Sequence, residues 1–141
     1  MERRVGTYVL SDDKGLLQKD AVCALVQGSY WGNTRSREAI EKSLETSLCY
    51  GAYENGVQCA FARVVTDFAV MFWLCDVLVA EEHRGRGLGK ALVEMVLDTP
   101  VLAGLTGVLA TRDAHGLYAR YGFLRDTEGR FMRRRPPEFS R

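Results

Sequence analysis

Three basic residues and three glycines occupy six of the seven positions from Arg84 to Lys90, between an apolar run and an apolar-periodic run. Glycine at a strand-to-helix turn lets backbone amides approach a ligand, and the amino terminus of a helix attracts anions. The spacing therefore predicts a phosphate-binding turn. Two familiar phosphate loops do not fit. A Walker A loop needs glycine in place of Arg84 and Ser or Thr in place of Ala91, and a dinucleotide fingerprint needs glycine in place of Lys90.

Hydrophobic periodicity places this turn within a series of strands and helices. The dipeptide Asn55-Gly56 between two alternating segments is a strong hairpin signal. A strand meander followed by a crossover unit predicts a mixed sheet with helices on its faces. In chain order we expect a strand at 5–10, a helix from Leu16 to about Gly28, a helix capped by Thr34 or Ser36, strands at 48–54, 57–66 and 68–79, a helix at 87–97, a strand at 105–111, a short helix at 115–121 and a final strand or two within 123–134.

The whole chain has the composition of one ordinary globular domain, residues 1–141. Its formal net charge of +1 disfavours nucleic acid and membrane surfaces as partners. The four cysteines form no C-x-x-C pair and suit buried, reduced thiols, so no metal site is expected. The amino terminus lacks the apolar run of a signal peptide, and we expect a cytoplasmic protein.

The turn has a close counterpart in a known family. The pattern Arg84-x-x-Gly87-x-Gly89 resembles the acyl-CoA-binding signature of the GNAT superfamily of N-acetyltransferases, and the segment Leu117-Tyr-Ala-Arg-Tyr-Gly-Phe123 is similar to the family's Y-x-x-x-G-F segment. The expected element order, β-α-α-β-β-β-α-β-α-β, is also that of the family. The resemblance covers essentially the whole chain. It implies an α/β (α+β) fold with a central mixed, mostly antiparallel sheet of six to seven strands and helices on both faces.

The resemblance also implies how acetyl-CoA, as co-substrate, would be held. The amides from Gly85 to Gly89, including those of Arg86, Gly87 and Leu88, would bind the pyrophosphate together with Arg84 and Lys90. The backbone of Leu78 and Val79 would pair with the pantetheine arm. Tyr118 matches the tyrosine that protonates the coenzyme A thiolate, and a phenol is protonated at neutral pH. Packing on the sheet is the alternative role for Tyr118.

The base and the acceptor pocket are less sharply indicated. Asp76 lies in an apolar strand, where an unpartnered carboxylate would be costly to bury. It is therefore either catalytic or well hydrogen-bonded, and His115 or a water relay is an alternative base. Tyr30 and Trp31 could wall a pocket for an amine or anchor the helix pair to the core. Arg63 could bind an acidic group of the substrate.

The function expected from these residues is direct acetyl transfer from acetyl-CoA to the primary amine of a small molecule. Two alternatives stay open. One is acetylation of a protein or peptide amine, and the other is a catalytically weak module that senses acyl-CoA. A homodimer is also left open.

Overall fold

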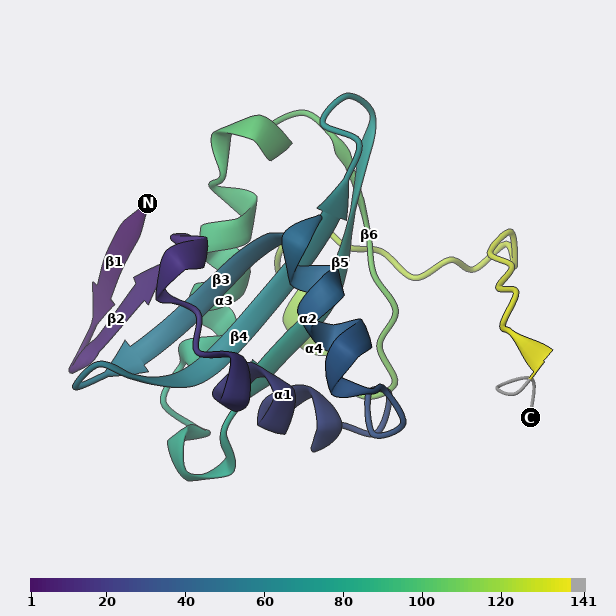
Figure 1. Ribbon diagram of the computed structural model, residues 1–141. Helices are drawn as coiled ribbons and strands as arrows, with labels where there is room; N and C mark the ends of the chain where they lie inside the picture. The colour runs from purple at the N-terminus through teal and green to yellow at the C-terminus, as the bar shows by residue number, and fades with distance from the viewer. Residues whose placement is uncertain (138–141) are drawn as a thin grey trace. The chain divides into compact units, whose positions relative to one another are not determined.

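The computed structural model describes residues 1–137, and the chain divides into two compact units, one of residues 1–110 and one that begins at Thr111 (Figure 1). The first unit holds a six-stranded sheet in the order β1-β2-β3-β4-β5-β6. Neighbouring strands are antiparallel except β5 and β6, which are parallel. The strands are β1 (Glu2–Val5), β2 (Tyr8–Ser11), β3 (Leu48–Glu54), β4 (Val57–Thr66), β5 (Met71–Val79) and β6 (Thr106–Val108).

Different helices cover the two faces of this sheet. Helices α1 (Lys19–Gln27) and α2 (Arg37–Glu45) lie in front of it and α3 (Leu88–Leu97) lies behind it in Figure 1. Helices α1 and α2 bury their apolar stripes against the strands, in a cluster of Val22, Cys23, Val26, Ile40, Leu44, Cys49, Phe61 and Leu78. The mixed, mostly antiparallel sheet with helices on both faces confirms the predicted fold class.

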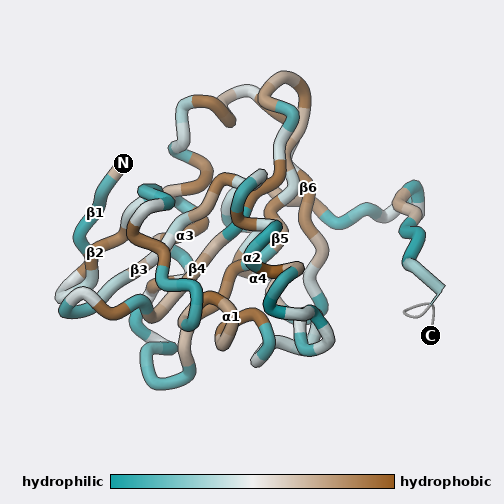
Figure 2. The backbone as a smooth tube through the Cα atoms, viewed as in Figure 1, coloured by the Kyte–Doolittle hydropathy of each residue, from teal (hydrophilic) through white to brown (hydrophobic). Residues whose placement is uncertain are grey.

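Helix α3 packs against β3, β4 and β5. Ala52, Ala60 and Ala62 are fully buried in two of these strands. The helix itself buries six of its ten residues, which is why its sequence is apolar on more than one side. In Figure 2 hydrophobic residues recur along β4, β5 and α3, whereas β1 is mainly hydrophilic.

The local signals in the sequence explain where these elements begin and end. Asn55 and Gly56 both have positive φ, 50° and 76°, and join β3 to β4 with the bounds predicted for the hairpin. Ser36 caps α2 by accepting a hydrogen bond from the Ala39 amide at 3.1 Å. Gly28 follows the last residue of α1. Three short 3-10 helices, η1 (Lys14–Leu16), η2 (Glu81–His83) and η3 (Pro100–Leu102), connect the larger elements.

The first strand was predicted as one run at 5–10 and is instead a hairpin of β1 and β2. Gly6, with a φ of 57°, turns the chain between Val5 and Tyr8. The expected strands at 68–79 and 105–111 are present but shorter, as β5 and β6.

The final strand predicted within 123–134 is wrong, because the structure describes this segment without a strand. Asp126 binds the backbone amides of Glu128 and Phe131 instead, which competes with a strand ladder. Leu124 and Met132 are 88% and 92% exposed, so the segment has no buried apolar face to hold a register. In the second unit the structure describes one helix, α4 (His115–Ala119).

No helix within residues 1–137 is long and apolar enough to cross a membrane. All four cysteines are free thiols, three of them buried, and burial raises the pKa of each. These thiols are therefore protonated and poorly reactive at neutral pH.

Two buried tyrosines of β3 provide a test of this packing. The Tyr50 hydroxyl lies 2.7 Å from Thr99 Oγ1, whereas the buried Tyr53 hydroxyl has no hydrogen-bond partner within the described residues. Burial raises the pKa of both phenols, that of Tyr53 to about 12. We expect Tyr50→Phe to lower the free energy of unfolding by about 1 kcal/mol in urea titrations, because a buried hydrogen bond is lost.

Tyr53→Phe is the matched control. It removes a buried hydroxyl that is unpaired, so we expect an unchanged or higher free energy of unfolding. Equal destabilisation by the two substitutions would contradict the assignment of the hydrogen bond to Tyr50 alone.

Candidate active site

The turn before α3 exposes backbone amides to an open space. Gly85 and Gly87 have backbone φ angles of 76° and 81°, which residues other than glycine rarely adopt. A Cβ at either position would meet no atom within 4 Å, so the space beside the turn is empty of protein. The first backbone bond of α3 runs from the Ala91 amide to the Gly87 carbonyl at 3.0 Å. The amides of residues 88–90 therefore have no partner inside the helix and can bind an anion.

Strand β5, which leads into this turn, has an open edge beside it. Parallel pairing with β6 covers only Met71 to Trp73, which face Thr106 to Val108. From Leu74 to Val79, β5 continues with no strand on that side among residues 1–137. Leu78 and Val79 lie at the end of this open edge, next to the turn. An extended ligand could pair with the backbone there, as an added strand does.

The basic side chains of the turn have different surroundings. Arg84 Nε donates to the Val79 carbonyl at 3.2 Å and so fastens the turn to the end of β5. Arg86 Nη1 donates to the Tyr8 hydroxyl at 2.8 Å, and the same hydroxyl lies 2.8 Å from His83 Nδ1. Lys90 is exposed in the first turn of α3. Sequence analysis missed Tyr8 and His83, because no local pattern connects β2 with this turn.

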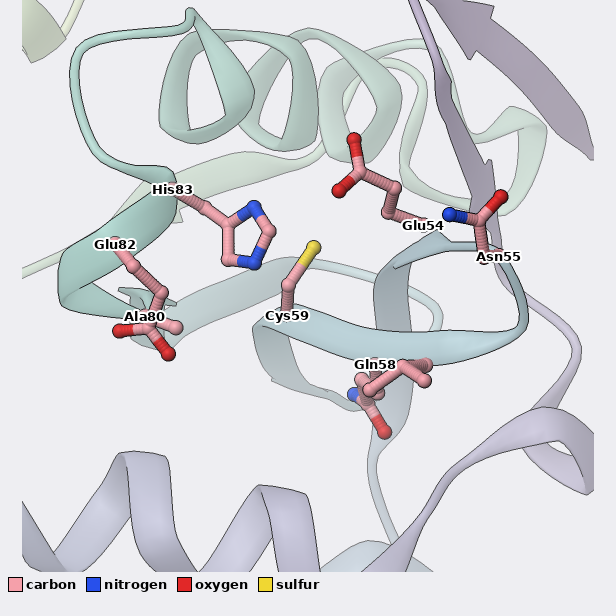
Figure 3. A pocket seen from close by; sticks show the side chains of 8 residues that line it. Glu54, Asn55, Gln58, Cys59, Ala80, Glu82 and His83 are labelled. Atoms are coloured by element: carbon pink, nitrogen blue, oxygen red, sulfur yellow. The ribbon is translucent and has the colours of Figure 1, made fainter.

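A cavity of about 280 Å³ lies beside the turn, between the β3–β4 hairpin and η2 (Figure 3). Figure 3 shows the His83 ring and the Cys59 thiol directed toward each other, with Glu54 above them. Glu54 and Glu82 line this cavity, and His83 is its one basic lining residue. Two carboxylates make it a poor site for phosphate groups. The glycine turn therefore fits the predicted phosphate site better than this cavity does.

A buried charge cluster lies on the face of the sheet covered by α1 and α2. Asp76, in β5, is only 2% exposed. Its Oδ2 accepts a hydrogen bond from Arg63 Nε at 2.8 Å and its Oδ1 accepts one from Trp31 Nε1 at 2.7 Å. Arg35 Nη1 approaches both oxygens, at 3.3 and 3.4 Å. The sequence predicts that Asp76 is either catalytic or well hydrogen-bonded. The structure shows a well-hydrogen-bonded carboxylate.

The protonation of Asp76 follows from these partners. Burial alone would raise the pKa of its carboxyl, but the hydrogen bond and charge of Arg63, the indole of Trp31 and the charge of Arg35 outweigh burial and lower the pKa. Asp76 is therefore ionised at neutral pH. A bulge in β5 at Cys75 lies directly before it, since Arg63 pairs with Asp76 while Val64 pairs with Leu74.

The structure brings three of the predicted site residues together around this carboxylate. Trp31 and Arg63 bind Asp76, and Tyr30 packs edge-on against Trp31 with ring centroids 4.9 Å apart. Tyr30 and Trp31 are 47% and 37% exposed, so the pair also presents aromatic surface to solvent. Sequence analysis did not predict Arg35 as a site residue. Its position directly before the cap of a predicted helix does not indicate a contact with Asp76, 41 positions away.

Tyr118 belongs to the second unit. It lies in α4, where its ring packs edge-on against Phe123 at a centroid distance of 6.0 Å. The Phe123 amide donates to the Tyr118 carbonyl at 3.3 Å, and Gly122, with a φ of 86°, turns the chain between them. His115 is the first residue of α4. The predicted roles of Tyr118 and His115 stay predictions.

Comparison with known proteins identifies relatives of this chain. A model of the family described as acetyltransferase (GNAT) domain matches residues 45–125. A crystal structure of a GNAT-family protein from Xanthomonas campestris pv. campestris is 38% identical, with a TM-score of 0.89 and coverage of 96% of this chain and 98% of that one.

Two curated relatives are also similar. A Gibberella zeae protein named as an acetyltransferase is 28% identical over 64% of this chain. The chloroplastic GCN5-related N-acetyltransferase 2 of Arabidopsis thaliana is 36% identical over 48% of it. The chain covers 63% of the first and 27% of the second, less than two thirds of either.

The buried carboxylate of Asp76 is expected to contribute to the free energy of unfolding. Asp76→Asn leaves the Arg63 and Arg35 guanidinium groups without their counter-charge, and we expect the free energy of unfolding at pH 7 to fall by about 3 kcal/mol in urea titrations. The folded-state pKa of Asp76 is lowered, so its contribution is complete above the unfolded pKa of about 4 and is lost as pH falls through the folded pKa. The difference between parent and variant should shrink below about pH 4.

Asp98→Asn is the control for this measurement. Asp98 forms an exposed pair with Arg3, with its side chain 61% exposed, and such pairs contribute less than about 1 kcal/mol. A loss at Asp76 no larger than that at Asp98, or one independent of pH, would contradict the role of the buried cluster in stability.

Proposed function

Because this chain belongs to the GNAT acetyltransferase family, we propose that it transfers the acetyl group of acetyl-CoA to the primary amine of a small molecule. One observation carries the proposal. The glycine turn presents unpaired amides of α3 to an open space, directly after the open edge of β5. The first feature suits a pyrophosphate and the second suits an extended amide-bearing chain. Coenzyme A contains both, in that order.

The residues of the turn fit this cofactor in type as well as in position. In the proposed complex the amides of Gly85 to Gly89 bind the pyrophosphate, and Arg84, Arg86 and Lys90 supply positive charge. Leu88 is buried, so it contributes its amide and its side chain belongs to the core. The backbone of Leu78 and Val79 pairs with the pantetheine arm.

The reaction requires no covalent intermediate with the protein. Acetyl-CoA supplies an acetyl thioester. The amine nitrogen forms a bond to the acetyl carbon, the carbon–sulfur bond breaks, the nitrogen loses one proton and the thiolate gains one. In this proposal Tyr118 donates the proton to sulfur, a role taken from the family resemblance.

The role proposed for Asp76 is to position the acceptor site rather than to remove the proton. Its two oxygens already accept hydrogen bonds from Trp31 and Arg63, and its lowered pKa makes it a weak base. His115 or a water relay is then the route for the amine proton. Tyr30, Trp31 and Arg63 form the proposed acceptor side. Acetylation of a protein or peptide amine and acyl-CoA sensing are the alternatives, and a cytoplasmic location stays a prediction.

Cofactor binding can be tested at Gly89, which lies in α3 without a positive φ. We expect coenzyme A or acetyl-CoA to raise the melting temperature of the parent, because a ligand that binds the native state stabilises it. Gly89→Glu places a carboxylate among the phosphate-binding amides and should abolish the shift. Gly89→Ala is the control, since its Cβ would meet only Val79 Cγ2, at 3.9 Å, and should keep most of the shift. An undiminished shift in Gly89→Glu would reject the turn as the phosphate site.

The acid can be tested with a pair of tyrosines from the same segment. Tyr118→Phe is expected to lower kcat about 10-fold or more while the Kd for acetyl-CoA changes little, because the lost interaction forms in the transition state. Tyr121→Phe, three positions along, should leave kcat nearly unchanged. With chemistry rate-limiting, equal turnover by Tyr118→Phe and the parent would exclude Tyr118 as the acid.

A further inference from the structure

The charges around Asp76 do not balance. One carboxylate lies between two guanidinium groups, those of Arg63 and Arg35. Arg63 is the closer partner, at 2.8 Å, and its side chain is 13% exposed, whereas Arg35 lies at 3.3 Å and is 35% exposed. Asp76 therefore neutralises Arg63, and the excess positive charge rests on the guanidinium that reaches solvent.

The unused donors of Arg35 are fit for a planar anion. A guanidinium has five N–H donors in a rigid fork, and Arg35 uses only Nη1 on Asp76. Within residues 1–137 the structure gives Nε and Nη2 of Arg35 no hydrogen bond and gives Arg35 no second carboxylate. Two N–H groups of such a fork can bind both oxygens of a carboxylate, and charge-assisted pairs of this kind are the strong ones.

The loop between α1 and α2 holds Arg35 in place. The Arg35 amide donates to the Gly32 carbonyl at 3.0 Å, and Gln27 Nε2 donates to the Arg35 carbonyl at 3.0 Å. Gly32 is needed for this path, since a Cβ there would lie 2.5 Å from the Val26 carbonyl oxygen. Hydrogen bonds through both the amide and the carbonyl of Arg35 therefore fix the backbone that carries its guanidinium.

Arg35 also lies beside the aromatic pair. Trp31 binds Asp76 Oδ1, one of the two oxygens that Arg35 approaches. The exposed rings of Tyr30 and Trp31 lie five and four positions before Arg35 in the chain. An apolar wall next to a partly exposed cation suits a molecule that carries an apolar body and an anionic group.

From this geometry we propose that Arg35 binds a carboxylate on the acceptor, so that the acceptors of this enzyme are primary amines that also carry a carboxylate, such as amino acids. This inference rests on the proposed acetyltransferase function and narrows its substrate class. Arg35 acts as a specificity residue in this proposal. The charge of Arg63 is already neutralised by Asp76, and its Nη1 donates a hydrogen bond to Ser47 Oγ at 3.1 Å. Arg63 therefore positions the carboxylate that orients Arg35 and Trp31.

The test compares amines that differ only in the carboxylate: alanine with ethylamine, phenylalanine with phenethylamine, and tryptophan with tryptamine. In the parent we expect kcat/KM for acetylation to favour the carboxylate-bearing member by at least about tenfold, the size of one charge-assisted hydrogen bond. Arg35→Gln should reduce this ratio to nearly one, chiefly by raising KM for the amino acids. The Kd for acetyl-CoA should not change.

Arg37→Gln is the matched control, because Arg37 is an exposed arginine two positions away that pairs with Asp20 and Glu41. It should leave the ratio as in the parent. If Arg35 only supports the fold, Arg35→Gln will lower both members of each pair equally and keep the ratio, which would overturn the inference. A parent that prefers the amines without a carboxylate would overturn it too, while amine acetylation itself still stands. A parent that binds acetyl-CoA but acetylates none of the six amines would reject the small-molecule acetyltransferase proposal and this inference with it.

Discussion

The buried carboxylate of Asp76 holds separate parts of this molecule together. A charge that is 2% exposed needs partners, and the fold supplies them from two separate places. Arg63 comes from β4, and Trp31 and Arg35 come from the loop between α1 and α2. The apolar stripes of α1 and α2 hold the helices on the sheet. The hydrogen bonds to Asp76 decide how the loop between them lies, since Trp31 and Arg35 must both reach the same carboxylate.

The same strand serves both halves of the proposed site. On one face β5 carries Asp76 and thereby orients the acceptor side. Its end carries Leu78 and Val79, and Arg84 then fastens the glycine turn back to Val79. The bulge at Cys75 lies near the start of the open edge of β5, two residues after Trp73, the last residue of β5 that pairs with β6. A strand that changes its pairing at this point can direct a charged side chain to one face and leave its backbone free at one edge.

Sequence reasoning succeeded where the cause is local. Asn55-Gly56 requires two positive φ values in succession, so the hairpin bounds follow from the dipeptide alone. The start of α3 follows from Gly87 in the same way. The pairing of β5 with β6 for only three residues was not predictable, because it depends on how far a crossover helix displaces the returning strand.

The charge cluster shows why the rest of the site could not be predicted. Asp76 was singled out because it interrupts an apolar strand, but its partners stand 13, 41 and 45 positions away. Periodicity indicates that an aspartate in such a strand must be paired and does not indicate with which residue. The strand predicted within 123–134 was wrong for a local reason, not because of distant partners. Its sequence has strand-forming residues, but local hydrogen bonds from Asp126 satisfy amides that a strand would have used.

The open edge of β5 has a consequence for how the protein behaves in solution. An unpaired strand edge exposes a row of donors and acceptors that any other extended chain can use, including the edge of a second molecule. From Leu74 to Val79 this edge is six residues long and largely apolar, which is the composition that favours such self-association. A bound cofactor would occupy the same hydrogen-bonding groups. In the proposed complex, a bound cofactor would then also cover the edge that a second molecule could pair with.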